Sequence, residues 1–485
     1  MAPSKSWFTL EDAKASFNLF CCVYGIGTLG MPGNFARAGP VLAVVAMVFM
    51  AFANIYSSLC ISKVMLKAPK SVRTFGDLGE WCMGKTGRWL IVVAQVANCT
   101  LIPCVFLVLG GGLLTSLFPD TFKDSVWIIF MALSLLPVCL IPTLKEGAGA
   151  AAAGCLGTLI ADIIGISVLM HGMSGHTSIP KPNISFDQVA TTFGNLSLAY
   201  GAGIVIPALQ RQHSEPERMP RVVVVTLTLI SILFLVLAST GYSAIGCQIS
   251  GNLLYTIFPN AETGLSALGF HSDKGAAVLA FLFMQLHITI GFAVILHPAL
   301  YVFERVLLGM HKVQQDDIEA LNYAAADTPG DEMKYRPSKG SVVSIADIEK
   351  TKDEESEEAE YKGHEWKYIP MRIVVVAIMT LVAILLKDHF GDLSDFVGAS
   401  AITACCIVLP TIFYLKKFWN TLPLWEKCWG LIIVVVCTVL GVYVTIKTGK
   451  ALFKPGSSAG DPKFKFCHAE FQNVVYWNAT AVHGN

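Results

Sequence analysis

Long stretches of this chain carry almost no charge, and that feature limits its possible folds more than any other. Of its 485 residues, 54% are hydrophobic and only 14% are charged, whereas a soluble chain has roughly a quarter of its residues charged. The charges are concentrated in a few segments. The remaining apolar stretches reach the about 18 residues that a membrane-spanning helix requires. We therefore expect an all-α polytopic membrane protein.

The apolar stretches divide into eleven predicted spans, several longer than the roughly 20 residues that a bilayer requires, which implies tilt or extension into solvent. Their approximate bounds are 13–36, 40–62, 88–117, 125–143, 149–171, 191–210, 221–246, 275–303, 370–387, 394–415 and 427–446. The segment 1–12 before them is polar. No small-residue cleavage site ends the first span, so we expect it to stay in the mature protein.

Lysines and arginines in short loops predict the orientation, because they favour the cytoplasmic side. With 1–12 in the cytoplasm, the cytoplasmic segments hold Lys5, Lys14, Lys63, Lys67, Lys70, Arg73, Lys85, Arg88, Lys145, Arg211, Arg218, Arg221, Lys416, Lys417 and Lys427. The short outer loops then hold only Arg37, Lys123, Lys181, Lys274 and Lys387. The tail, 447–485, is therefore predicted to lie outside the cell or in a lumen.

The predicted outer segments contain the candidates for covalent modification. Cys247 and Cys467 are the only cysteines there, and an oxidising compartment would allow them to form a disulfide. Asn183 and Asn478 each begin an N-x-S/T triplet in the same segments. They are candidate glycosylation sites, although such triplets also occur by chance.

The polar segment 305–369 separates the eighth and ninth spans and contains the acidic run KDEESEEAE at 352–360. Such a composition buries too little apolar surface to fold, so we expect a disordered cytoplasmic loop. Either a cytoplasmic regulator binds it or it is a solvated linker. The formal net charge of zero gives no reason to expect a nucleic-acid partner. The cysteines and histidines show no metal-site spacing, so we expect no metal or organic cofactor.

The first span is interrupted near its middle by GIGTLGMP at 25–32. Glycine lowers helix stability and proline lacks the backbone N–H. In hydrocarbon every freed backbone group needs a partner, so a break here is tolerated where a polar substrate or an ion fills the gap. Close helix packing at the glycines is the alternative interpretation.

The sixth span carries a similar interruption, YGAGIVIP at 200–207. Spans one and six each open a group of five, and paired interruptions at corresponding positions predict an inverted-repeat transporter. Because five is an odd number, the two groups run in opposite directions. We expect one repeat at 13–171, the second at 191–415 and an additional helix at 427–446.

The ends of broken helices can bind a zwitterion without charged side chains. A half-helix N-terminus exposes N–H groups and a partial positive charge that suit a carboxylate. A half-helix C-terminus offers carbonyls that suit an ammonium group or a cation. The spans contain almost no fixed basic residue, so backbone recognition of an amino acid is the economical prediction.

At these interruptions the chain resembles the amino acid/auxin permease family, within the amino acid–polyamine–organocation superfamily. The similar segments are GIGTLGMP in span one, YGAGIVIPALQRQHSEPERMPR at 200–221 and HPALYVFERVL at 297–307. The resemblance covers most of 13–446. It implies a LeuT-like fold with two inverted five-helix repeats plus an eleventh helix. It also implies amino acid transport coupled to H⁺ or Na⁺.

The resemblance further implies that the substrate lies between helices one and six. The implied contacts are Gly25, Ile26, Gly27, Thr28, Leu29, Tyr200, Gly201, Ala202 and Gly203. Cys21 stands where sodium-coupled relatives often carry Asn, which argues against sodium coupling. A His that some relatives have after the helix-six glycine is replaced here by small residues, and the substrate identity stays open.

Ionisable residues inside the spans are candidates for the coupling ion. Asp162 lies mid-span five, where a carboxylate must face the interior; it either carries a proton or is a permanently neutral structural acid. His287 and Thr289 lie near the middle of span eight, which faces the coupling-ion site in the implied fold. His287 could relay protons or be a satisfied core residue. Gln95 and Asn98 lie in span three. They are secondary substrate candidates, or they simply form hydrogen bonds between helices.

These patterns predict a secondary active amino acid transporter, with H⁺-coupled symport by alternating access. A Na⁺-coupled symporter and an amino acid-sensing membrane receptor with a transporter fold are the alternatives. No catalytic residue constellation appears at motif spacing, so we do not expect an enzyme. We expect residence in the plasma membrane, with a vacuolar or endosomal membrane as the alternative.

Overall fold

The computed structural model describes residues 7–69, 72, 74–141, 147–175, 180–249, 252–310, 361, 363–454 and 462–475. Helices account for almost all of the regular structure in these ranges. The α-helices are α1 Leu10–Val23, α2 Met31–Lys67, α3 Phe75–Leu117, α4 Asp124–Leu140, α5 Gly147–Gly172, α6 Phe186–Ala199, α7 Ile206–Gln212, α8 Met219–Ile245, α9 Leu253–Ile257, α10 Lys274–Phe303, α13 Glu365–Leu385, α14 Phe390–Val397, α15 Leu409–Phe418 and α16 Leu424–Leu452. The 3₁₀ and π segments are η1 Ile26–Gly30, η2 Pro216–Arg218, η3 Glu304–Leu308, η4 Gly398–Val408 and η5 Ala469–Phe471.

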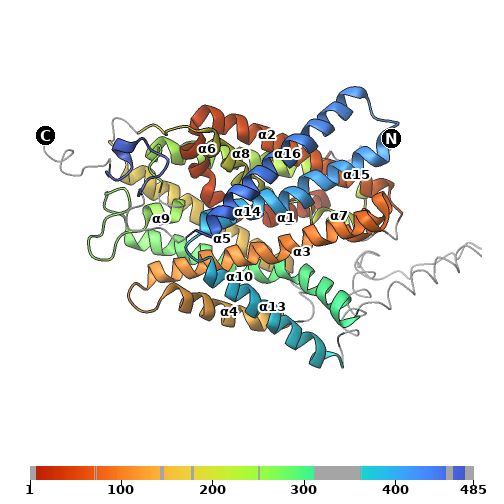
Figure 1. Ribbon diagram of the computed structural model, residues 1–485, viewed down its shortest axis with the longest axis horizontal. Coiled ribbons are helices and arrows are strands. Elements are labelled where there is room, and N and C mark those ends of the chain that lie inside the picture. The colour runs from red at the N-terminus through yellow and green to blue at the C-terminus, as the bar shows by residue number, and fades with distance from the viewer. Residues whose placement is uncertain are drawn as a thin grey trace, which may run out of the picture.

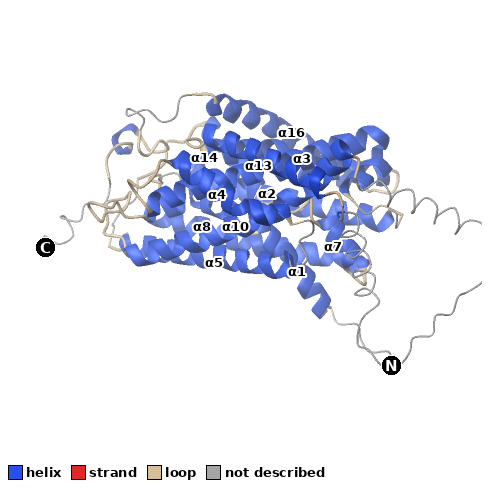
Figure 2. Cartoon of the chain, turned by 90° about the horizontal axis from the view of Figure 1, so that it is seen from below, coloured by secondary structure: helices blue, strands red, loops and turns tan. Residues whose placement is uncertain are grey.

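The long helices lie side by side with their axes in roughly the same direction (Figure 1). The short helix α9 lies near the C-terminal end of the bundle, and α7 lies at the opposite end with the N-terminus. The perpendicular view shows the same separation of the two ends (Figure 2). We call the first the disulfide end, after the bond between Cys247 and Cys467, and the second the N-terminal end.

Within the described residues, eight helical stretches are long and apolar enough to cross a membrane, and Asp124–Leu140 is a shorter apolar helix. Their outward faces are apolar as well. On α2, for example, exposed side chains recur at helical spacing at Val41, Val45, Val48 and Phe52. Such a surface is stable only against hydrocarbon, since water would have to solvate it. The protein is therefore a helical polytopic membrane protein, as predicted.

The helix bounds differ from the predicted spans at several ends. The α3 helix begins at Phe75 rather than near residue 88, because an additional helical segment precedes a kink at Gly84, whose φ is 69°. The predicted loop at 305–369 is shorter at both ends, since η3 extends the eighth span and α13 begins at Glu365. Residues 311–360 lie outside the described residues. The last helix, α16, runs to Leu452, so the tail begins later than predicted.

Local sequence signals explain where the first helices begin and bend. Thr9 caps α1 by accepting from the Asp12 N–H, while the Asp12 carboxylate accepts from the Thr9 N–H. Gly39 has a φ of 73° and bends α2 before Pro40, a backbone conformation that glycine adopts without steric cost. This bend separates the first predicted span from the second.

Packing brings the interrupted helices into the interior. The α10 helix packs along α5 and α3, and α2 packs along α8 and α6. The short η1 segment packs against α6. Elements from both halves of the chain therefore surround the break in the first span.

A buried ion pair joins three helices at the N-terminal end. The Nε of Arg372 on α13 donates to the Oε1 of Glu304 at 2.7 Å, and both side chains are fully buried. The same guanidinium donates to the carbonyls of Cys139 and Ile141, at the end of α4. Tyr361 donates to the second Glu304 oxygen at 2.8 Å. These bonds satisfy the buried charges and hold α4, α10 and α13 together.

Candidate functional site

The two predicted interruptions are real breaks in the helices, and they meet inside the bundle. The α1 helix ends at Val23, Gly25 is extended, and regular α-helix resumes at Met31. The α6 helix ends at Ala199 and α7 begins at Ile206. A Cβ on Gly27 would lie 2.6 Å from the Cα of Ala199. Only glycine permits this approach, so the first break packs directly on the end of α6.

The predicted substrate residues lie in these breaks and mostly away from the surface. Gly25 and Gly201 are half-buried, and the others are buried, namely Ile26, Gly27, Thr28, Leu29, Tyr200, Ala202 and Gly203. The Tyr200 hydroxyl donates to the Ser231 hydroxyl on α8 at 2.7 Å. The unwound backbone therefore faces protein interior rather than lipid, which is the condition for non-helical structure at membrane depth.

Asp162 on α5 binds the first break from the side. Its carboxylate accepts from the Tyr24 hydroxyl at 3.1 Å and from the Thr28 hydroxyl at 3.1 Å. The Asp162 side chain is 2% exposed. The predicted inward-facing carboxylate is thus bound to both ends of the Tyr24–Thr28 segment. Sequence reasoning missed Tyr24, although it directly precedes the first glycine of the interruption.

His287 on α10 approaches the same segment at Gly25. Its Nδ1 is hydrogen-bonded to the Gly154 carbonyl on α5 at 3.1 Å. Its Nε2 lies 3.0 Å from the position that a Cβ on Gly25 would occupy. The ring also packs edge-on against Phe106 of α3. One short unwound segment therefore contacts both Asp162 and His287.

Thr289 does not belong to this group, contrary to the prediction. Its side chain is exposed, and its hydroxyl donates to the Gln285 carbonyl of its own helix. Successive helical residues are about 100° apart, so a residue two positions from His287 points to nearly the opposite face. The interior face of α10 therefore includes His287 and excludes Thr289.

Asn98 lies beside the second break, through η4. Its Nδ2 donates to the Sγ of Cys405 at 3.6 Å, whereas its buried Oδ1 has no partner among the described residues. Cys406 is the neighbour that a Cβ on Gly203 would meet, at 2.9 Å from its Cα. The unpaired oxygen keeps Asn98 a candidate substrate contact. Gln95 is only partly buried.

Two asparagines that sequence reasoning did not select join the broken helices. The Nδ2 of Asn34 on α2 donates to the Oδ1 of Asn195 on α6 at 2.8 Å. Asn195 also lies where a side chain on Gly30 would be. An amide in an otherwise apolar span is the sequence signal that could have identified both residues.

Charged side chains form ion pairs near both ends of the bundle. At the disulfide end, Arg37 on α2 pairs with Asp395 on α14 at 2.5 Å. At the N-terminal end, Arg218 donates from Nε and a terminal nitrogen to the fully buried Asp12 carboxylate at 2.9 and 2.7 Å. These hydrogen bonds hold the pKa of Asp12 well below its ordinary value. His213 also contacts Asp12, at 3.1 Å.

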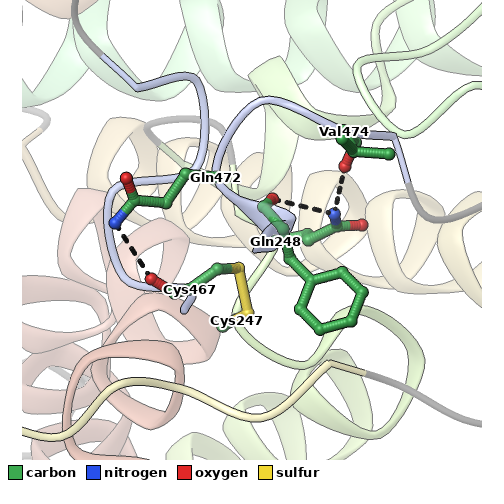
Figure 3. The surroundings of a disulfide bond; sticks show 6 residues. Cys247, Gln248, Cys467, Gln472 and Val474 are labelled. Carbon is green, nitrogen blue, oxygen red and sulfur yellow. Dashed lines mark hydrogen bonds between the residues drawn. A yellow bond between two sulfur atoms is a disulfide. The ribbon is translucent and has the colours of Figure 1, made fainter. Parts of the chain in front are cut away.

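The structure joins the two cysteines expected to pair. Cys247, directly after α8, is disulfide-bonded to Cys467 (Figure 3). Asn183 has an exposed side chain at the same end of the bundle, and its backbone N–H donates to the Phe466 carbonyl at 2.9 Å. Asn478 lies outside the described residues.

Comparison with known proteins identifies the family. A family model described as "Transmembrane amino acid transporter protein" matches residues 11–452. The chain belongs to this family. The resemblance to the amino acid/auxin permeases that the sequence indicated is therefore confirmed.

Curated members of this family from plants and yeast are similar along much of the chain. Amino acid transporter ANT1 of Arabidopsis thaliana is 22% identical over 89% of this chain and 90% of its own length. Amino acid transporter AVT1I of the same plant is 25% identical over 48% of this chain and 60% of its own length. Vacuolar amino acid transporter 7 of Saccharomyces cerevisiae is 25% identical over 52% of this chain and 53% of its own length.

Solved structures share the fold at low sequence identity. The structure of MhsT in complex with L-phenylalanine has a TM-score of 0.53 and is 12% identical, covering 90% of this chain and 98% of that chain. A manganese transporter of Eremococcus coleocola has a TM-score of 0.52 at 11% identity, covering 93% of this chain and 89% of that chain. The fold is therefore LeuT-like, as the resemblance to the amino acid/auxin permeases implied.

Proposed function

We propose that this protein is a secondary active amino acid transporter that couples uptake to protons. The observation that carries the proposal is the Tyr24–Thr28 segment. It lies inside the bundle where α1 ends and the 3₁₀ segment η1 begins, adjoins the end of α6, and contacts both the Asp162 carboxylate and His287. Backbone and ionisable side chains thus meet where the substrate and the coupling ion are expected.

We infer that the chain consists of two inverted five-helix repeats followed by α16 as an eleventh span. The break between α1 and α2 opens the first group, and the break between α6 and α7 opens the second. Both LeuT-like neighbours support this arrangement. Corresponding breaks place the substrate site at the repeat interface, near mid-membrane.

The substrate would be held by helix ends rather than by a charged side chain. The helical stretch that begins at Ile26 in η1 and continues into α2 offers its first N–H groups to a carboxylate, and the carbonyls that end α1 and α6 suit an ammonium group. The unpaired Oδ1 of Asn98 is a second acceptor near the α6 break. A free amino acid has both groups, which matches the substrate in the names of the relatives.

The coupling step follows from the hydrogen bonds of Asp162. The ionised carboxylate accepts from both Tyr24 and Thr28. A protonated carboxyl group is itself a donor and has less capacity to accept. Binding a proton therefore weakens the link between α5 and the break and biases the conformation of that segment. Cys21, next to α5, supplies no oxygen ligand for sodium, which favours the proton as the coupling ion.

Alternating access requires that the two ends open in turn. The Arg37–Asp395 pair closes the disulfide end, and the Asp12–Arg218 pair closes the N-terminal end. We assign the disulfide end to the extracellular or lumenal side, as the lysine and arginine distribution predicts. We propose the plasma membrane as the site of residence; the name of the yeast relative favours a vacuolar membrane as the second candidate.

The test is uptake into proteoliposomes, with each standard amino acid at two pH values. We expect that at least one amino acid accumulates faster under an inward proton gradient, because each proton gains about 2.3 kcal/mol per 100 mV. Uptake that follows sodium and ignores pH would replace the proton by sodium as the coupling ion. Saturable binding without any net flux would instead favour an amino acid-sensing receptor.

A further inference from the structure

The described C-terminal residues 462–475, here called the strap, form a compact unit at the disulfide end. The Phe464 N–H donates to the Gln472 carbonyl at 2.8 Å, and the Gln472 side chain donates to the Cys467 carbonyl at 3.1 Å. Phe464 and Cys467 are fully buried. The strap is therefore packed into the protein rather than extended away from it.

The strap is attached to two connections between helices, of which Figure 3 shows the one at Cys247 and Gln248. Cys467 forms the disulfide with Cys247, in the α8–α9 connection. The neighbouring Gln248 side chain donates to the Val474 carbonyl at 2.7 Å. On the other side, the Asn183 N–H, in the α5–α6 connection, donates to the Phe466 carbonyl. These bonds fix the position of the Phe466 backbone.

The Phe466 side chain contacts the ion pair that closes this end. The Arg37 guanidinium lies 5.3 Å from the centre of the Phe466 ring, and its other partner is the Asp395 carboxylate. Lys465 lies close enough to act electrostatically on Asp395. Arg37 and Asp395 are largely buried, so the cation–π contact forms in a poorly solvated place, where such contacts are strongest.

The two partners of the ion pair belong to different helices. Arg37 lies on the first turns of α2, directly after the first break. Asp395 lies on α14, whose backbone packs against Gly194 of α6. Opening the disulfide end would separate Arg37 from Asp395, and the strap stands at this junction.

We propose that the strap is a gating element, in which Phe466 positions Arg37 against Asp395 and the Cys247–Cys467 disulfide keeps Phe466 in place. Opening of the disulfide end then requires that Phe466 release Arg37. This inference rests on the proposed function, but its test does not use transport. A result that overturns the proposed role of the strap can therefore be distinguished from one that overturns the transport assignment.

The first experiment compares hydrogen–deuterium exchange of the purified full-length protein before and after reduction of the disulfide with a phosphine. We expect peptides covering 31–39 and 390–397 to exchange about five- to thirtyfold faster after reduction, as loss of a largely buried cation–π contact predicts. Peptides of α7 and α1 are the control and should not change. If the strap itself exchanges faster while 390–397 does not, the proposal is wrong.

The second experiment distinguishes the contribution of the Phe466 ring from that of the Cys247–Cys467 disulfide. Phe466→Ala should increase the exchange rate at 390–397. Phe466→Tyr should keep the wild-type exchange rate, because tyrosine keeps an aromatic face for Arg37. Val474→Ala is the matched control, since the Val474 side chain is largely exposed and its hydrogen bond to Gln248 uses the main-chain carbonyl. In an Arg37→Gln background, Phe466→Ala should add nothing. Additive effects of the two substitutions would overturn a positioning role for Phe466.

Discussion

Tyr24 and Asp162 are 138 residues apart in sequence and share a buried hydrogen bond of 3.1 Å across the first helix break. Thr28 donates to the other carboxylate oxygen. The break is thus held open by a side chain from α5 and not only by its own glycines. The predictions below follow from this contact and from the ion pairs at the N-terminal end.

Asp162→Asn should abolish proton-driven accumulation. An amide keeps most of the shape of the carboxyl group but cannot bind the coupling proton. At a membrane potential of 100 mV, one proton supplies a driving force of about 2.3 kcal/mol. Its loss corresponds to an accumulation ratio about fiftyfold lower. Gradient-free exchange of substrate across proteoliposomes should continue. Accumulation at the wild-type ratio would exclude Asp162 as the proton carrier.

Tyr24→Phe should lower the uptake rate about 10- to 150-fold, because it removes a hydrogen bond to a charged acceptor worth about 1.5–3 kcal/mol. The phenyl ring can keep its stacking on Phe20, whose centroid lies 5.1 Å away. In the Asp162→Asn background the same substitution should have little further effect. A double-mutant cycle measures this, and fully additive losses would contradict action through Asp162.

His287→Leu should lower uptake about fivefold, since it removes the hydrogen bond to Gly154 next to the break, worth about 1 kcal/mol. Thr289→Val is the matched control on the same helix. Its hydroxyl is exposed and bonds only to its own helix, so uptake should stay within about twofold of wild type. If both variants lose uptake equally, the cause is a change in the stability of α10 rather than the contact of His287 with the break.

Arg218→Gln should lower the melting temperature throughout pH 5–8. Hydrogen bonds from Arg218 lower the pKa of Asp12, so the stabilisation is complete above the ordinary value of about 3.9 and disappears as pH falls through the lowered value. The pair should therefore add no pH dependence between pH 5 and 8. Arg221→Gln is the control, because within the described residues the Arg221 guanidinium donates to the Trp7 carbonyl rather than to Asp12. It should lower the melting temperature less than Arg218→Gln does. If the melting temperature of the wild type falls steeply between pH 7 and 5 and that of Arg218→Gln does not, the result is inconsistent with a lowered pKa of Asp12.

Arg372→Met should destabilise the protein by about 3–5 kcal/mol, because it leaves the fully buried Glu304 without its ion-pair partner. The double variant Arg372→Met with Glu304→Leu should recover part of this loss, since no unpaired charge remains. Thermal unfolding in detergent measures both. If the double variant is less stable than the single one, the pair contributes through packing rather than charge.

Much of the architecture was readable from the chain because its signals act locally. Apolar runs mark helices that need lipid, and GIGTLGMP and YGAGIVIP mark the residues at which two of them cannot stay helical. The helix ends differ from the predicted spans where caps and kinks, rather than the hydrophobic pattern, set the boundary. A capping Thr9 and a kink at Gly84 extend or divide helices without changing their hydrophobic pattern.

The sequence by itself determined that this is a helical membrane protein with two broken helices and an inward carboxylate at Asp162. Only the tertiary structure decided which side chains meet: Asp162 with Tyr24 and Thr28, Arg37 with Asp395 358 residues away, and Thr289 turned outward. The physical reason is that helix formation depends on neighbouring residues, whereas contacts between helices depend on the rotation and packing of each helix against the others.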